Sequence, residues 1–391
     1  MGFILNYITE HSEGRVSSFD TLKRHIDERE LDTFGEFEDH KFDTVETDTH
    51  KKFAEERHSD TGVHLISQNE ANKFQDKSRF KYFLDGSRHV YKVGDVAIGG
   101  MIYPVVAGQI IVGCCQREKR VISDFEHIRK IVLAMPQCYD IDNHGKNFFL
   151  KKCKDINNAL NEKSNMPFDI KLDGIIPYKI DGSEVVRGKN KYLTQAITTI
   201  QNEMMDEERR MVNHLCLDGI VGESAKLIKD GTLEYKKNYS NASADADLDK
   251  AMFDIRIENV VGVSKMFDPE LLNKLEPRIG RILAELPPYS RTNAYRYVHE
   301  GKVYCVWYLR IRETYNRATS FSDIIKVELV MVGKDTIKTS QIDHISKNLI
   351  NEANPVCFGK DSRWANHLYP VYLTESYCKS KYIRFFRKMD R

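Results

Sequence analysis

The sequence contains no hydrophobic run that approaches the ~20 residues of a membrane span, and its N-terminus lacks the basic and then apolar layout of a signal peptide. Its eight cysteines are scattered, with no Cys-x-x-Cys and no histidine at the spacing of a zinc site. Neither charge is in large excess, because 59 Lys and Arg residues nearly balance 58 Asp and Glu residues. These absences argue against a membrane span, a structural zinc and a disulfide framework, and they predict a cytoplasmic protein with reduced cysteines.

A net charge of +1 gives little long-range attraction for a polyanion, so any contact with nucleic acid must come from a local basic groove. The 391 residues, 41% hydrophobic and 30% charged, are enough for one large domain or two closely packed ones. Residues 1–78 are polar and charged with some helical spacing, which predicts a helical N-terminal segment or a solvated face packed on the main domain. The main domain is expected over 79–391, with an irregular insertion around 136–190.

The hydrophobic pattern of the main domain predicts a mixed α/β fold. From Phe80 to Cys115 it favours three antiparallel strands joined by glycine-containing turns, the second turn being Ala107-Gly108. The later elements expected are helices over 122–135, 193–213, 269–286 and 341–353, and strands over 255–263, 294–299, 303–311 and 323–332. This order is typical of an RNase H-like mixed sheet flanked by helices, with a C-terminal β/α addition.

Two apolar runs end in Asp-Gly, which is one way to present a carboxylate at the end of a strand. Asp85 ends the run from Phe80, and Asp218 ends a short run that begins at His214. Another Asp-Gly, at Asp230, is interpreted as a turn, which is the commonest use of this dipeptide. If the strands of Asp85 and Asp218 are neighbours, the two carboxylates could bind a hard divalent cation, which prefers oxygen ligands.

Further candidates lie on the helix and strands that follow. Glu203 and Glu207, on the polar face of the 193–213 helix, are alternatives for a third carboxylate. Lys265 follows an apolar strand and could contact a phosphate or position a water, or cap a strand end in solvent. Glu328 lies in an alternating strand and is expected at the surface. The tail after Lys379 mixes basic and aromatic residues, which suits single-stranded DNA or a final amphipathic helix.

Six short marks together resemble the NurA nuclease family. In the family's order they are Leu84-Asp85-Gly86-Ser87, Glu203 on a helix, Leu217-Asp218-Gly219, Val261-Gly262-Val263-Ser264-Lys265, Val327-Glu328-Leu329 and Tyr369-Pro370. The chain departs from the family where the second motif reads Asp-Gly-Ile and where the helix before Asp218 is short, which leaves Glu207 a rival of Glu203. It also has Tyr377 eight residues after Tyr369, where the family typically has histidine, although nearby His367 could substitute.

The resemblance implies an RNase H-like DNA nuclease that uses Mn²⁺ or Mg²⁺, forms a homodimer and works with a HerA-type hexameric ATPase, in DNA end processing or anti-phage defence. It implies catalytic roles for Asp85, Glu203, Asp218, Lys265, Tyr369 and Tyr377. On this hypothesis Asp85 bridges two metal ions, and Glu203 and Asp218 are terminal ligands. Two alternatives stay open: a catalytically weak NurA-like adaptor of the ATPase, and another RNase H-like nuclease such as a Piwi-like module.

Overall fold

The structure is a computed structural model, and it describes residues 3–11, 17–19, 52–66, 78–98, 100–137, 154–159, 171–180, 191–235, 253, 255–299, 301–314, 319–357 and 364–382. Most of the basic aromatic tail and the helical spacing predicted after Phe19 lie outside these residues. No helix among the described residues is long and apolar enough to cross a membrane. The six described cysteines are free thiols, and five of them are buried.

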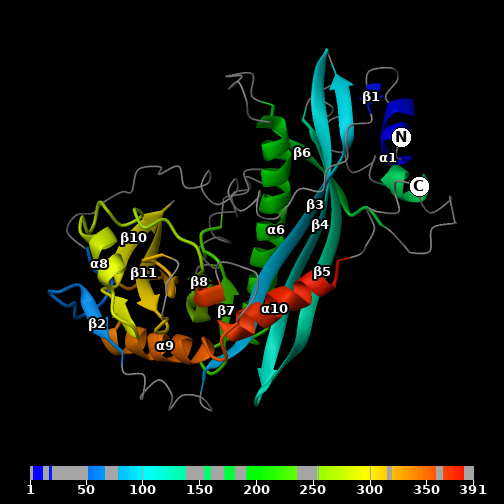
Figure 1. Cartoon of the computed structure of the whole chain (residues 1–391). Coiled ribbons are helices and arrows are strands. Elements are labelled where there is room, and N and C mark those ends of the chain that lie inside the picture. The colour runs from blue at the N-terminus through cyan, green and yellow to red at the C-terminus, as the bar shows by residue number, and fades with distance from the viewer. Residues whose placement is uncertain are drawn as a thin grey trace.

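One twelve-stranded sheet organises the described chain (Figure 1). Its strands run in the order β2-β9-β11-β12-β8-β7-β3-β4-β5-β6, with β1 paired to β3 and β10 to β11. The strands are β1 Ser17–Phe19, β2 Val63–Leu65, β3 Phe80–Ile98, β4 Met101–Glu118, β5 Val121–Pro136, β6 Gly174–Tyr178, β7 Lys226–Asp230, β8 Val260–Ser264, β9 Ser290–Thr292, β10 Tyr295–His299, β11 Lys302–Arg310 and β12 Ile324–Met331. Most pairs are antiparallel, but β7 is parallel to both β3 and β8.

The helices pack on this sheet from both sides. They are α1 Phe3–Glu10, α6 Lys191–Leu217, α8 Ile279–Glu285, α9 Thr339–Glu352 and α10 Tyr369–Ser380, with short 3-10 turns η1 Ile257–Asn259 and η2 Trp364–Asn366. Leu84 of β3 packs in the same hydrophobic cluster as α6, whereas its neighbour Phe83 packs with Val371 of α10. Because successive strand residues point to opposite faces, α6 and α10 cover opposite faces of the sheet around β3.

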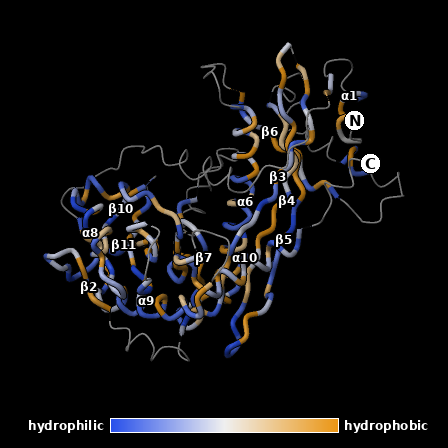
Figure 2. Tube along the Cα trace, in the orientation of Figure 1, coloured by the Kyte–Doolittle hydropathy of each residue, from blue (hydrophilic) through white to orange (hydrophobic). Residues whose placement is uncertain are grey.

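Strands β3, β4 and β5 form an antiparallel meander and are longer than the sequence pattern predicts. The first strand was expected to end at Asp85, and this is wrong, because β3 continues through Asp85 and Gly86 to Ile98. In Figure 2, β4 and β5 are hydrophobic for much of their length and the turn between them is hydrophilic. The predicted turn at Ala107-Gly108 is wrong, since β4 continues through it. Gly108 serves another purpose, because a Cβ there would lie 2.6 Å from Ile200 of α6. The predicted helix over 122–135 is also wrong: residues 131–135 form a continuous buried run between β4 and β6, as in a central strand.

The second half of the chain follows the predictions more closely. The hairpin β10–β11, strand β12 and helix α9 are confirmed within a few residues of their expected ends. The expected strand over 255–263 begins only at Val260, after η1, and the helix expected over 269–286 is reduced to α8. The mixed α/β sheet flanked by helices is therefore confirmed, and the RNase H-like assignment stays a prediction.

The N-terminal segment predicted over residues 1–78 and the irregular insertion predicted around 136–190 both contribute strands to the main sheet. In the N-terminal segment, β1 pairs with β3 and β2 pairs with β9. Within residues 136–190, β6 adds a parallel strand beside β5. Helix α1 is the described helical part of the N-terminal segment.

Candidate metal centre

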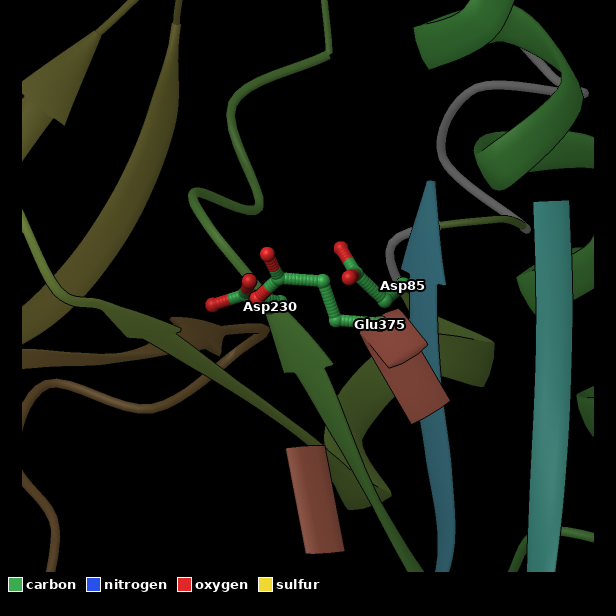
Figure 3. A group of neighbouring side chains, drawn as sticks. All are labelled: Asp85, Asp230 and Glu375. Atoms are coloured by element: carbon green, nitrogen blue, oxygen red, sulfur yellow. The ribbon is translucent and has the colours of Figure 1, made fainter. Parts of the chain in front are cut away.

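Three carboxylates from three separate elements converge beside the end of β7. One oxygen from each of Asp85, Asp230 and Glu375 lies within 4.8 Å of the other two. Asp85 comes from β3, Asp230 is the last residue of β7, and Glu375 projects from α10 (Figure 3). The described residues hold one cluster of this kind with ligand atoms so close together.

The pairing of β3 with β7 brings the two aspartates to the same place. Leu84 is the register partner of Lys229 in this parallel pair, so the next residues, Asp85 and Asp230, point together to the α10 face. At Gly231, a φ of +82° lets the chain turn away directly after Asp230. The sequence device of a strand that ends in Asp-Gly is therefore present at Asp230.

Helix α10 lies against β3, and its Glu375 approaches the two aspartates from the helix side. Its buried residues Val371, Thr374 and Cys378 recur at helical spacing and face the sheet. The thiol of Cys378 donates a hydrogen bond to the backbone oxygen of Asp85, at 3.5 Å. These contacts leave Glu375, next to Thr374, at the rim of the packed face, where its carboxylate meets the two aspartates.

Lys265, whose side chain is 10% exposed, lies among the carboxylates. The Nζ atom of Lys265 is 2.8 Å from Oδ2 of Asp230 and 2.9 Å from Oε2 of Glu375. The other oxygen of Glu375 is 3.0 Å from Lys379 Nζ. Burial acts to raise the pKa of Glu375, but Lys265 and Lys379 outweigh it and lower that pKa to about 2. Glu375 is therefore ionised at neutral pH.

Of the three carboxylates, Asp85 has the least compensation of its negative charge by nearby lysines. Its side chain is buried, and burial, followed by the nearby charge of Asp230, raises its pKa well above the ordinary range, while Lys265 acts in the opposite direction. A cation bound at these oxygens would favour the ionised form.

A fourth carboxylate, Glu208 of α6, reaches the same region from the other face of the sheet. It is buried, and its Oε2 lies 2.8 Å from Nζ of Lys229. Its carboxylate lies directly over Gly86, where any Cβ would overlap it. Gly86 therefore makes room for Glu208 beside Asp85, and the charge of Glu208 contributes to the raised pKa of Asp85.

Asp218 lies outside this cluster. The strand predicted over 214–219 is wrong, because α6 continues to Leu217 and keeps its buried stripe through Leu215. Asp218 follows the helix in a turn, with its side chain 53% exposed and 3.4 Å from His214 Nδ1. The structure therefore does not bring Asp218 to Asp85.

Glu203 and Glu207 point to β5 and not to the cluster. Both pair with Lys130, Glu203 at 3.0 Å, and Glu207 also pairs with Arg210. On α6 the residue that faces the acidic cluster is the next one along, Glu208.

The remaining candidates divide between two sides of α10. Tyr369 begins this helix and is half-buried. The hydroxyl of Tyr377 lies 3.1 Å from Nδ1 of His127 on β5, so this side chain is directed toward β5. His367 is buried, with Nδ1 4.0 Å from Oε2 of Glu375. Of the two proposed replacements for the family histidine, His367 therefore lies beside the acidic cluster.

The donor set fits a hard divalent cation. All the ligand atoms are carboxylate oxygens, which suit Mg²⁺ and Mn²⁺ better than a soft metal. Lys265 already holds a positive charge between Asp230 and Glu375, which shows that the cluster accommodates a cation there. Asp85, Asp230 and Glu375 are the residues that would hold the metal, with Glu208 near enough to add charge.

Comparisons with known proteins give limited results. No model of a known protein family matches the chain, and no curated protein matches its sequence. Among solved structures, the chain is similar to the NurA nuclease from Sulfolobus solfataricus, at 11% sequence identity and a TM-score of 0.36, over 80% of this chain and 84% of that chain. A match with this TM-score does not establish the function, which has to be argued from the residues.

Proposed function

We propose that this protein is a metal-dependent nuclease that hydrolyses DNA phosphodiesters at the cluster of Asp85, Asp230 and Glu375. The observation that carries the proposal is the convergence of three carboxylates and a largely buried lysine, from four separate segments of the chain, on one point beside the sheet. The ordered motifs that resemble the NurA family support the choice of substrate.

The reaction requires an aligned water and neutralisation of the charge that develops on the phosphate oxygens. Bound Mn²⁺ or Mg²⁺ supplies both by lowering the pKa of water and by stabilising negative charge. In this chain, Asp85, Asp230 and Glu375 would hold the cation. Lys265 orients two of these carboxylates and can contact a phosphate oxygen, and His367, beside Glu375, is placed to give a proton to the leaving oxygen.

The proposal extends to partners on the basis of the sequence resemblance. We propose a homodimer that receives DNA from a HerA-like hexameric ATPase, in end processing or in defence against invading DNA. The net charge of +1 supports a need for such a partner, since the isolated protein attracts DNA weakly from a distance.

Two matched variants test the site. Purified protein is incubated with plasmid and linear DNA in Mn²⁺, Mg²⁺ or EDTA, with and without the ATPase, and Mn²⁺ binding is measured by calorimetry. Asp230→Asn should abolish both Mn²⁺ binding and cleavage, because it removes a ligand without changing the shape of the side chain. Asp218→Asn should leave both unchanged, since Asp218 is exposed after α6.

The outcomes also separate the alternatives. Mn²⁺ binding without cleavage, even with the ATPase present, would favour the catalytically weak adaptor. Loss of cleavage in Asp218→Asn with full activity in Asp230→Asn would overturn the assignment of the metal site to Asp85, Asp230 and Glu375.

A further inference from the structure

Behind Asp230, on the α6 face of the sheet, two buried ion pairs hold the loop Gly231–Leu233. The first contains Glu328 of β12, which was expected at the surface but is fully buried. One oxygen of Glu328 accepts hydrogen bonds from the Thr232 hydroxyl, at 2.7 Å, and from the backbone N–H of Leu233. The other oxygen lies 2.8 Å from Nζ of Lys326, two residues earlier on the same face of the strand.

The second pair holds the same loop by its backbone. Nζ of Lys229 donates a hydrogen bond to the carbonyl oxygen of Thr232, at 3.0 Å, and pairs with Glu208 at 2.8 Å. Thr232 is therefore held twice: its hydroxyl by Glu328 and its carbonyl by Lys229. We call these four charged residues and Thr232 the loop clamp.

A glycine gives the clamp its space. Gly262 of β8 lies between Lys229 and Glu328 in the sheet, as register partner of each. A Cβ at this position would lie 2.8 Å from Cγ of Glu328 and 2.9 Å from Cγ of Leu233. The bare backbone of Gly262 thus allows the Glu328 side chain to cross β8 and reach the loop.

Fold stability alone does not account for two ion pairs at this position. Taking charged groups out of water costs several kcal/mol per ion, and well-packed apolar residues often serve as well or better. What the pairs provide is direction, because hydrogen bonds to charged groups fix the positions of the atoms they join. Both pairs end on the loop that begins one residue after Asp230.

We propose that Thr232 and Glu328 are positioning residues for the metal centre, which fix the direction of the Asp230 carboxylate by holding the loop that follows it. The inference rests on the proposed function, in which Asp230 is a metal ligand. Residues that orient metal ligands typically change metal affinity by about 10- to 100-fold when they are removed.

The sharpest test changes the Thr232 hydroxyl. Thr232→Val keeps the shape of the side chain and removes the bond to Glu328, whereas Thr232→Ser keeps the bond. Mn²⁺ affinity is measured by calorimetry, and thermal unfolding is followed in EDTA. We expect Thr232→Val to weaken Mn²⁺ binding by about tenfold or more, and Thr232→Ser to restore it to near the wild-type value.

A buried threonine remote from the site separates positioning from general damage. Thr292 of β9 is fully buried, and its hydroxyl bonds to backbone atoms of Asn293 and Tyr308. Thr292→Val should lower the Tm in EDTA and leave the Mn²⁺ affinity unchanged.

Three results would overturn the clamp. One is wild-type Mn²⁺ affinity in Thr232→Val, and another is an equal loss of affinity in Thr292→Val; either would leave the proposed function intact. The third is failure of the wild-type protein to bind Mn²⁺ at all, which would remove the proposed function and the clamp with it.

Discussion

Asp85→Asn should abolish DNA cleavage and, in the absence of metal, make the protein more stable. Asp85 is buried, and the charge of Asp230 adds to the effect of burial in raising its pKa. An asparagine of the same shape removes that charge. Loss of activity together with a gain in stability is characteristic of a residue kept for function at a cost to the fold.

The geometry gives the size of the effect. Two unit charges within 4.8 Å of each other repel by about 3.5 kcal/mol or more at an effective dielectric constant of ~20, and Lys265 offsets part of this repulsion. We therefore expect Asp85→Asn to raise the free energy of unfolding by about 1–3 kcal/mol in EDTA at neutral pH. For a chain of this size, that gain corresponds to a rise in Tm of roughly 1–4 °C.

The pH dependence provides a second check on the same variant. The folded-state pKa of Asp85 is raised above its value of about 3.9 in the unfolded chain, so its contribution to stability is most favourable at low pH and is lost as the pH rises through the folded pKa. The advantage of Asp85→Asn should thus be absent near pH 4 and grow toward neutral pH.

The assay is thermal unfolding in EDTA across this pH range, with Asp218→Asn as the exposed control. Added Mn²⁺ should stabilise the wild-type protein but not Asp85→Asn, because only the wild-type retains the full ligand set. A variant that is less stable than wild type in EDTA at neutral pH would refute the proposed crowding of charge at Asp85.

Three further predictions concern neighbours of the site. His367→Gln should slow single-turnover cleavage about tenfold or more, while Tyr377→Phe should cleave near the wild-type rate; the reverse ranking would assign the proton donor to Tyr377. Gly86→Ala should lower the free energy of unfolding in denaturant by about 1–3 kcal/mol, because the new methyl group overlaps a buried carboxylate, and an unchanged value would contradict that packing. The Lys265 and Lys379 ammonium groups outweigh burial and lower the pKa of Glu375 to about 2. The contribution of Glu375 to stability is therefore complete above its unfolded pKa and is lost as the pH falls toward 2. Glu375→Gln should flatten that part of the pH–stability curve.

The rule of an apolar strand that ends in Asp-Gly describes Asp230, which was interpreted as a turn, and neither of the two positions to which it was applied. β3 continues through Asp85 and Gly86 to Ile98, and Asp218 follows helix α6. Asp85 nevertheless lies in the carboxylate cluster, where its neighbour is Asp230 and not Asp218. The pattern before Asp218 is helical, since Met211 and Leu215 continue the buried stripe of α6. The strand before Asp230 was hidden because Lys229, a charged residue, lies inside the buried sheet and is accommodated by Glu208, whose position the sequence does not reveal.

Carboxylates supplied by helices were the hardest to predict. On α6 three glutamates lie within six positions, and their periodicity alone does not show that Glu207 faces Lys130 while Glu208 faces Gly86. On α10, Glu375 had no local signal, since its role depends on how the helix crosses β3. Packing between elements distant in sequence decided both cases, whereas the strands and helix near the C-terminus follow from local periodicity.

Lys265 explains how these carboxylates can be brought together while the chain folds. Asp230 and Glu375 share its ammonium group, and Lys379 also contacts Glu375, so two of the three negative charges are compensated from within the chain. Asp85 is left as the carboxylate with most to gain from an added cation. On the proposed function, a site arranged in this way can fold before it binds metal.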